Sequence, residues 1–257
     1  MTAVIHQFLC LEDNFGVLVH DPQTGATASM DAPEAAPILA ALAAREWRLT
    51  DILITHHHAD HVQGIGELKE RFPRARVVGS LREATKIAAG LDVAIGEGES
   101  VEIGALEATV MDVPGHTSGH VAYWFRQEDI AFTGDTLFAM GCGRGFEEPA
   151  AVLFHSLMKL AALPAETKIY CGHEYTLANA RFALSVDPGN VNLRQRALDV
   201  ARQREAGKLT LPTTIALELA TNPFLRADEP DIQVILGMRG ADPAAVFAEL
   251  RERKNRA

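Results

Sequence analysis

Four potential metal donors lie within the segment 55–61, which reads THHHADH. The four are His56, His58, Asp60 and His61. Imidazole and carboxylate groups at such short spacing are typical of a metal-assisted hydrolase. His57 lies between two of these donors. Because neighbouring side chains cannot all point at one ion, we expect His57 to support the site rather than bind metal.

Three further donors lie apart in the sequence, and each follows an apolar run. They are His116 in PGHTSGH (114–120), Asp135 in TGDT (133–136) and His173 in YCGHEY (170–175). A set without thiolates suits zinc, iron or manganese, and a carboxylate can bridge two ions through its two oxygens. We expect His56, His58 and His116 to bind one ion, Asp60, His61 and His173 to bind a second, and Asp135 to bridge them.

Structural elements must bring these donors together. Residues 51–54 have the composition of a buried strand, and the apolar residues of 61–72 recur at helical spacing, so the first four donors are expected on a strand-to-helix loop. Strands are also predicted at 4–10, 17–20, 27–31, 76–79, 100–103, 106–113, 121–125, 129–133 and 168–171. Helices are predicted at 33–46, from Leu81 with Ser80 as its cap, from about 150 to 163, at 175–185 and at 192–205.

This order predicts sheets covered by helices, followed by a mostly helical final hundred residues. We therefore expect two domains, a metal-binding catalytic domain over 1–168 and a mainly helical substrate-binding domain over 169–257, with His173 contributing to the metal site.

Composition limits the classes of function. The 257 residues are 47% hydrophobic and carry a formal net charge of −10, which weighs against nucleic acid as a partner. The chain begins without a basic segment followed by a long apolar one, and it has no apolar run long enough to span a membrane. The three scattered cysteines form no CxxC pair. We expect a cytoplasmic enzyme, monomeric or weakly oligomeric, that acts on neither nucleic acid nor membrane.

The HxHxDH motif followed by separate His, Asp and His donors resembles the metallo-β-lactamase superfamily. Longer strings resemble the glyoxalase II (hydroxyacylglutathione hydrolase) family within it: THHHADH at 55–61, PGHTSGH at 114–120, GDTLF at 134–138, GCGR at 141–144, YCGHEYT at 170–176, NPFLR at 222–226 and the ending at 247–254. The resemblance implies an α+β fold, with an αββα metallo-β-lactamase sandwich and a C-terminal helical domain.

The resemblance also implies a reaction, the hydrolysis of S-2-hydroxyacylglutathione, expected to be S-D-lactoylglutathione, to D-lactate and glutathione in methylglyoxal detoxification. Two divalent ions, zinc or alternatively iron or manganese, would activate water, and Asp60 would orient the resulting nucleophile. A thiolate leaves without needing a proton, so a thioester suits this chemistry.

Glutathione carries two carboxylates, which require clustered cations in an acidic protein. Arg144 follows the expected bridging residue by nine positions, and Arg251 and Lys254 share one helix face. These three are the expected carboxylate anchors, and family correspondence adds Phe146 and Tyr175. The chain departs from the family at 145–149, where GFEEP replaces the common pattern.

Two other functions fit the same motifs. A mono-iron glutathione persulfide dioxygenase shares HxHxDH, although the helical ending with Arg251 and Lys254 favours the hydrolase. A non-enzymatic module that binds a thiol metabolite could retain the scaffold, but it would not need all seven donors.

Overall fold

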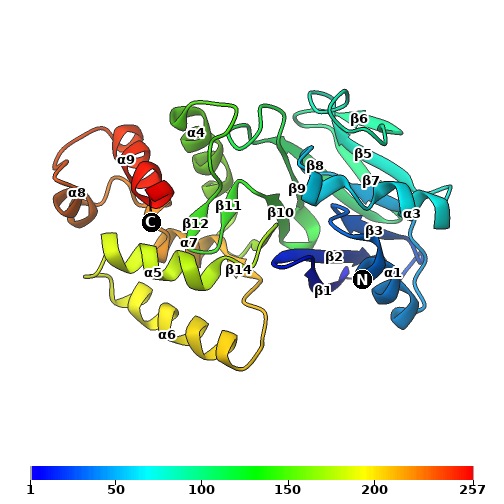
Figure 1. The fold of residues 1–257 in the computed structure, drawn as a ribbon, viewed down its shortest axis with the longest axis horizontal. Coiled ribbons are helices and arrows are strands. Elements are labelled where there is room, and N and C mark those ends of the chain that lie inside the picture. The colour runs from blue at the N-terminus through cyan, green and yellow to red at the C-terminus, as the bar shows by residue number, and fades with distance from the viewer. Residues whose placement is uncertain (1, 257) are drawn as a thin grey trace. The chain divides into compact units, whose positions relative to one another are not determined.

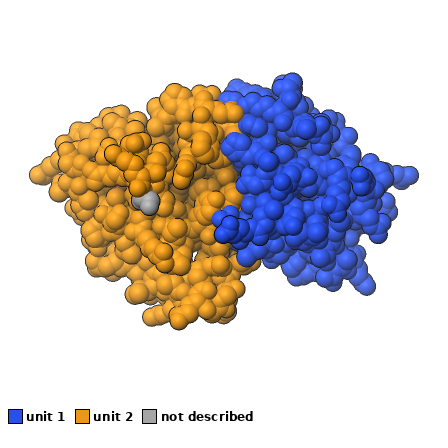
Figure 2. Space-filling view, in the orientation of Figure 1, with its two compact units in different colours: residues 1–112, 118–134 blue, residues 113–117, 135–257 orange. Residues whose placement is uncertain are grey.

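The computed structural model describes residues 2–256. Its chain forms two compact units, coloured separately in Figure 2. Unit 1 comprises residues 1–112 and 118–134, and unit 2 comprises residues 113–117 and 135–257. None of the helices in the described part of the chain is long and apolar enough to cross a membrane.

Unit 1 contains a mixed six-stranded sheet (Figure 1). Its strands, in spatial order, are β1 (Val4–Cys10), β2 (Asn14–His20), β3 (Thr27–Met30), β4 (Asp51–Leu53), β5 (Arg76–Ser80) and β6 (Val93–Ile95). The pairs from β1 to β3 are antiparallel and those from β3 to β6 are parallel. Because β3 and β4 are parallel, the loops that follow them leave from the same edge of the sheet.

Two helices cover this sheet. α1 (Ala35–Arg45) and α3 (Ile65–Arg71) contribute Ile38, Leu42 and Leu68 to an apolar core that also contains Ile52 from β4. All four of these side chains are 0–1% exposed, so burial of apolar surface fixes the helices against the sheet.

A second, antiparallel set of strands completes unit 1. It contains β7 (Ser100–Ile103), β8 (Leu106–Asp112), β9 (Val121–Phe125) and β10 (Ile130–Gly134), with a 3-10 turn at Arg126–Glu128 between the last two. The hydroxyl of Tyr123 in β9 donates to the carbonyl of Ile54 at 2.8 Å, just beyond β4. Tyr123 is wholly buried, so it ties the two sheets together beside the histidine-rich loop.

One helix prediction in unit 1 is wrong, and another needs correction. The helix expected from Leu81 is a series of turns through Lys86, in which the Glu83 carboxylate accepts the backbone N–H groups of His57 and Gly119 instead of facing solvent. The helix expected over 61–72 is two helices, α2 (Ala59–Val62) and α3. Gly64 separates them because its N–H donates to Ala32 O and a Cβ there would lie 2.9 Å from that oxygen.

Unit 2 is mainly helical. Its helices are α4 (Ala150–Ala161), α5 (Thr176–Val186), α6 (Val191–Glu205), α7 (Ile215–Thr221), α8 (Pro230–Leu236) and α9 (Pro243–Arg256), with a 3-10 turn η2 (Pro223–Leu225). It also contains the hairpin β11 (Leu137–Phe138) and β12 (Gly141–Cys142), and the antiparallel pair β13 (Lys168–Cys171) and β14 (Thr213–Thr214).

Aromatic and aliphatic residues form the core of unit 2. Phe154 of α4 packs on Phe247 of α9, and Phe224 of η2 packs on both Phe247 and Phe182 of α5. Met140, between the two hairpin strands, is fully buried against α5 and α6. The hairpin is therefore embedded among the helices of its own unit.

Candidate metal centre

The structure gathers the four donors of segment 55–61 at one edge of the first sheet of unit 1. β4 ends at Leu53, the loop carries His56 and His58, and α2 begins at Ala59. Ring nitrogens of His56 and His58 lie 3.1 Å apart, and the rings of His56 and His61 have centroids 4.1 Å apart. A carboxylate oxygen of Asp60 and a ring nitrogen of His61 lie within 4.8 Å of each other.

Asp31 holds this loop, and we did not predict its role from the sequence. Its carboxylate, 5% exposed, accepts the backbone N–H of Thr55 at 2.7 Å and lies 2.8 Å from Nδ1 of His61. A hydrogen on Nδ1 leaves Nε2 of His61 as the nitrogen with a lone pair. One feature of the sequence could have indicated this role: Asp31 directly follows a buried strand, as the predicted donors do.

Asp60 also has a supporting residue that the sequence analysis missed. The amide of Asn14, at the start of β2 and 3% exposed, donates to the backbone carbonyl of Asp60 at 3.0 Å and to its carboxylate at 3.1 Å. Asn14 therefore fixes both the first turn of α2 and the direction of the Asp60 side chain.

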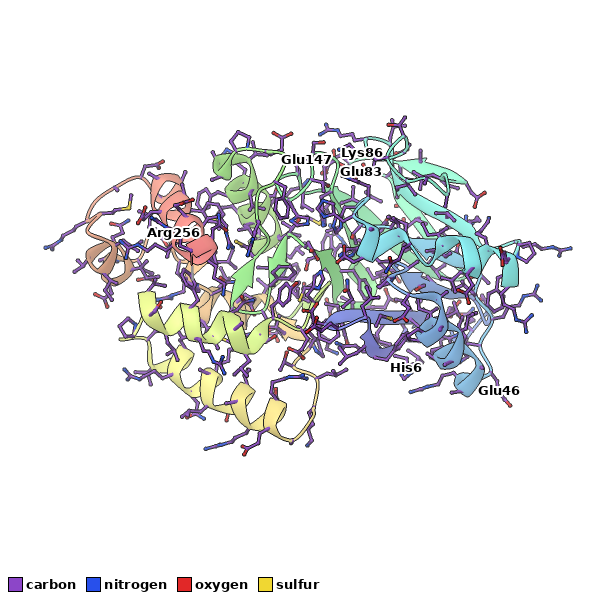
Figure 3. The ribbon with its side chains drawn as sticks, in the orientation of Figure 1. His6, Glu46, Glu83, Lys86, Glu147 and Arg256 are labelled. Carbon is purple, nitrogen blue, oxygen red and sulfur yellow. The ribbon has the colours of Figure 1, made fainter. Side chains whose placement is uncertain are left out.

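His57, predicted to support the site rather than bind metal, contacts Glu83, which Figure 3 labels. The Glu83 carboxylate is fully buried, contacts Nδ1 of His57 and accepts the N–H groups of His57 and Gly119. His120, immediately before β9, stacks on His56 with ring centroids 4.7 Å apart. These contacts hold the 55–61 loop against the turn that leads into β9.

The three remaining predicted donors gather in unit 2. His116 lies in the 113–117 loop, Asp135 follows β10 and His173 follows β13. Oδ2 of Asp135 lies 3.5 Å from Nε2 of His116 and 3.3 Å from Nε2 of His173. Nδ1 of His116 lies 2.9 Å from the carbonyl of Arg144, which directs Nε2 toward Asp135. All three side chains are 5–6% exposed.

These donor sets are suited to a divalent metal ion. Imidazole nitrogen and carboxylate oxygen are ligands of zinc, iron and manganese. The thiol of Cys171 in unit 2 is less suited to bind a metal ion, because burial raises its pKa to about 12 and favours the protonated form. Buried carboxylates beside histidines, as in both units here, are characteristic of metal sites.

Two predicted substrate residues lie beside the unit 2 donors. The ring of Phe146 is 5.2 Å from that of His116, and its side chain is 62% exposed. Tyr175 stacks on His173 with ring centroids 4.7 Å apart and planes 3° from parallel. Each aromatic ring therefore covers one of the histidines while presenting an exposed surface.

The predicted cations cluster in unit 2. Burial lowers the pKa of Lys254, and the charges of Arg251 and Arg144 lower it further. The Arg251 guanidinium is 6% exposed, donates to the carbonyl of Cys142 at 2.8 Å and lies 5.0 Å from the ring of Phe224. Arg144 is exposed. Three like charges in one region favour an anionic ligand.

Comparison with known proteins covers the whole chain. A metallo-beta-lactamase superfamily model matches residues 16–173, and one described as hydroxyacylglutathione hydrolase C-terminus matches residues 174–257. A hydroxyacylglutathione hydrolase of Rhodopseudomonas palustris is 53% identical, covering 100% of both chains, and one of Mesorhizobium japonicum is 56% identical, covering 99% of both.

The fold also matches solved structures. The crystal structure of ETHE1 from Myxococcus xanthus superposes with a TM-score of 0.67 and 28% identity, covering 98% of each chain. The BLEG-1 B3 metallo-beta-lactamase superposes with the same TM-score at 21% identity, covering 86% of this chain and 99% of that one. These matches confirm the predicted fold class. The chain belongs to the hydroxyacylglutathione hydrolase family of the metallo-beta-lactamase superfamily.

Proposed function

We propose that this protein is a metal-dependent thioesterase that hydrolyses S-2-hydroxyacylglutathione, and specifically S-D-lactoylglutathione, to D-lactate and glutathione in methylglyoxal detoxification. Full-length similarity to hydroxyacylglutathione hydrolases carries this proposal. The His and Asp donors in each unit supply the residue types that such a reaction requires.

Seven residues are the proposed ligands of two divalent ions. One ion is assigned to His56, His58 and His116, the other to Asp60, His61 and His173, and Asp135 is the proposed bridge. Zinc is the proposed metal, with iron and manganese as the alternatives that this donor set allows. Bound divalent ions lower the pKa of water and polarise a carbonyl group, which are the two effects that thioester hydrolysis requires.

The residues of this chain would orient the reacting groups. Asn14 donates to the Asp60 carboxylate, which supports the proposal that Asp60 accepts a hydrogen bond from the attacking water and directs its lone pair. The leaving group is the glutathione thiolate, which needs no proton to depart because its conjugate acid has a pKa of about 8.5. No general acid is therefore assigned.

The substrate peptide is assigned to unit 2. Arg144, Arg251 and Lys254 are the proposed partners of the two glutathione carboxylates, and their mutual repulsion would be relieved when an anion binds. The exposed faces of Phe146 and Tyr175 are the proposed contacts of the peptide chain. We also propose that the boundary between the two domains lies at 168/169. The enzyme is proposed to be cytoplasmic, and to be monomeric or weakly oligomeric.

One assay tests the proposal. Purified protein is incubated with S-D-lactoylglutathione, and loss of the thioester absorbance is followed before chelation, after chelation, and after zinc, iron or manganese is restored. We expect hydrolysis that stops on chelation and returns with metal. Absence of hydrolysis by the fully metallated protein, together with oxygen consumption on glutathione persulfide, would instead identify a persulfide dioxygenase. Binding without turnover of either compound would identify a binding module.

A further inference from the structure

Side chains from the helical part of unit 2 bond the backbone of the β11–β12 hairpin. Its carbonyl groups accept hydrogen bonds from three such residues: Asn222 donates to Phe138 O at 3.2 Å and to Gly141 O at 2.9 Å, Asn179 to Ala139 O at 3.1 Å, and Arg251 to Cys142 O at 2.8 Å. The remaining turn residue, Met140, donates its N–H to Glu218 at 2.8 Å. The buried backbone groups of this hairpin are therefore paired with side chains of α5, α7, α9 and Asn222, which follows α7.

The turn needs this support. Met140 has a φ of +53°, a left-handed conformation that costs free energy for any residue with a Cβ. It is also 0% exposed, so water cannot pair with its N–H. The Glu218 carboxylate supplies the acceptor at that position, and loss of this acceptor would leave a buried donor without a partner.

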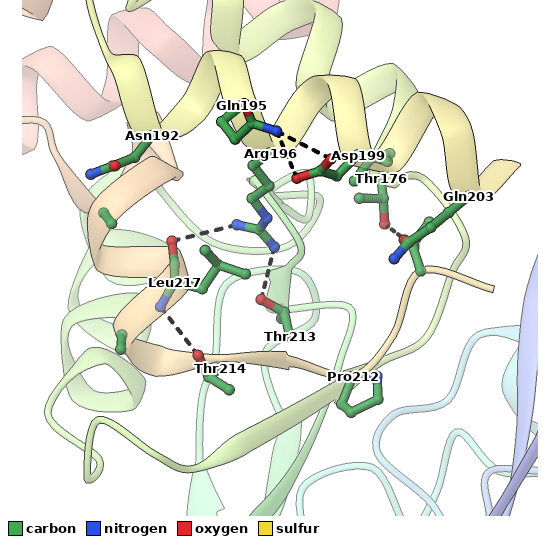
Figure 4. Close-up of a pocket in the computed structure, with 14 residues that line it drawn as sticks. Thr176, Asn192, Gln195, Arg196, Asp199, Gln203, Pro212, Thr213, Thr214 and Leu217 are labelled. Atoms are coloured by element: carbon green, nitrogen blue, oxygen red, sulfur yellow. Dashed lines mark hydrogen bonds between the residues drawn. The ribbon is translucent and has the colours of Figure 1, made fainter. Parts of the chain in front are cut away.

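Glu218 is itself fixed in position. It is 0% exposed, and its other carboxylate oxygen accepts from Arg196 at 2.5 Å and from Thr213 at 2.6 Å. Arg196 lines a cavity of about 650 Å³ between α6 and α7, where it also donates to Thr213 and Leu217 (Figure 4). Asn222 lies beside the pair, because its amide is 3.0 Å from Glu218. A buried charge paired in this way is rigid, which suits a positioning role.

The two ends of the hairpin lead to two proposed ligands. Asp135 precedes β11, and the N–H of Gly143 donates to Thr136 O at 3.2 Å. A Cβ on Gly143 would lie only 1.9 Å from Asp135 O, so the chain packs tightly there. Beyond β12, the carbonyl of Arg144 orients Nδ1 of His116 at 2.9 Å. A shift of the hairpin would therefore move two groups at once: the backbone of Asp135, and the Arg144 carbonyl that orients the His116 ring.

We propose that Glu218 and Asn222 are positioning residues for Asp135 and His116, acting through the hairpin 137–142. Neither touches a proposed ligand. Their effect on catalysis rests on the proposed function, but their effect on metal binding rests only on the donor set of unit 2. This assigns the helical part of the chain a role in arranging the metal ligands, in addition to binding the substrate.

The test is Asn222→Asp, which replaces an amide donor by a carboxylate that faces two carbonyl groups and Glu218. Asn190→Asp is the matched control. Asn190 also caps a helix through its side-chain oxygen, and it also donates to a carboxylate (Asp187, 2.8 Å) and a carbonyl (Ala220, 2.9 Å), but these partners lie outside the hairpin. Both substitutions replace an amide donor by a carboxylate beside an acidic side chain and a carbonyl group, so a difference in metal affinity between them reports on the hairpin.

Metal affinity of each variant is measured by chelator competition, without substrate, and kcat and KM by thioester hydrolysis. We expect Asn222→Asp to lower metal affinity by about 10- to 100-fold, the usual effect of disturbing residues that orient ligands, and to lower kcat more than it raises KM. Asn190→Asp should leave metal affinity unchanged. Equal metal affinities in the two variants would overturn the proposal.

If Asn222→Asp does not fold, Asn222→Ser decides the question. A serine hydroxyl can still cap η2 through Phe224 N–H, but it is too short to reach both hairpin carbonyls. The same loss of metal affinity, smaller in size, is expected, and unchanged affinity would overturn the proposal. An unsubstituted protein that binds metal but fails to hydrolyse the thioester would refute the proposed function and leave the metal-affinity comparison valid.

Discussion

The carboxylate of Asp31 lies 2.8 Å from Nδ1 of His61 and, at the same time, accepts the backbone N–H of Thr55 at 2.7 Å. One buried side chain thus orients an imidazole and anchors the start of the loop that carries it. A carboxylate that holds the second nitrogen of a histidine fixes the tautomer and increases the basicity of the nitrogen that faces a metal.

We expect Asp31→Asn to lower metal affinity by about 10- to 100-fold, because the amide keeps the shape but weakens the interaction with Nδ1 of His61. The measurement is chelator competition on the folded variant. Asp51→Asn is the control, since Asp51 is a buried carboxylate of the same sheet that pairs with Arg76 rather than with a histidine. Equal metal affinities in the two variants would mean that Asp31 holds the loop through the Thr55 N–H but does not tune His61 for metal binding.

Asp135→Ala should abolish binding of both proposed ions and reduce turnover to near background. One oxygen of this carboxylate already lies within 3.5 Å of ring nitrogens of His116 and His173, so its removal takes away the group they share. Metal content per chain is measured by elemental analysis after gel filtration. Asp187→Ala, which removes another buried carboxylate of unit 2, is the control. Retention of two ions by Asp135→Ala would exclude Asp135 as the bridge.

The proposed metal donors could be selected from the sequence because each follows an apolar run and belongs to a short, specific motif. Their supporting residues could not. Asp31 meets Thr55 only because β3 and β4 pair in parallel, and no local pattern around Asp31 indicates that pairing. Asn14 depends in the same way on the fold that brings the start of β2 to the first turn of α2.

The incorrect helix at Leu81 has a related cause. Local propensity favoured a helix after Ser80, but the side chain of Glu83 binds backbone groups at His57 and Gly119, which lie 26 and 36 residues away. Tertiary hydrogen bonds outweighed a weak local preference. The hairpin at 137–142 was also missed, because two-residue strands stabilised by distant side chains leave no periodic signal.

Lys254 should give the Michaelis constant a dependence on pH. Burial, followed by the charges of Arg251 and Arg144, lowers its pKa from the usual 10.5, so the ammonium group loses its proton at a lower pH than an ordinary lysine. As pH rises through that lowered pKa, attraction to a glutathione carboxylate is lost and KM for S-D-lactoylglutathione should increase. Lys254→Met should have a raised KM without this increase. If the two proteins show the same change of KM with pH, Lys254 does not bind the substrate.

Asp21 should contribute to stability in a defined pH range. The Thr24 hydroxyl and then the Ala105 N–H, which both donate to its carboxylate, lower its pKa from 3.8 to about 2. The bond from Thr24 lies within the β2–β3 turn, and the bond from Ala105 joins this turn to the β7–β8 turn. Because the folded state holds the proton less tightly than the unfolded state, the stabilisation is complete above the unfolded pKa and is lost as pH falls from 3.8 toward 2.

Asp21→Asn should therefore lower the free energy of unfolding at pH 6, and its difference from the unsubstituted protein should shrink between about pH 4 and pH 2. Urea denaturation of metal-free protein measures both values, so loss of metal in acid does not contribute. The same change at Asp228, an exposed residue of unit 2, should leave the free energy unchanged. The prediction fails if the difference in free energy of unfolding between Asp21→Asn and the unsubstituted protein stays constant down to pH 2. In that case the protonated carboxyl would hold the two turns together as well as the carboxylate does.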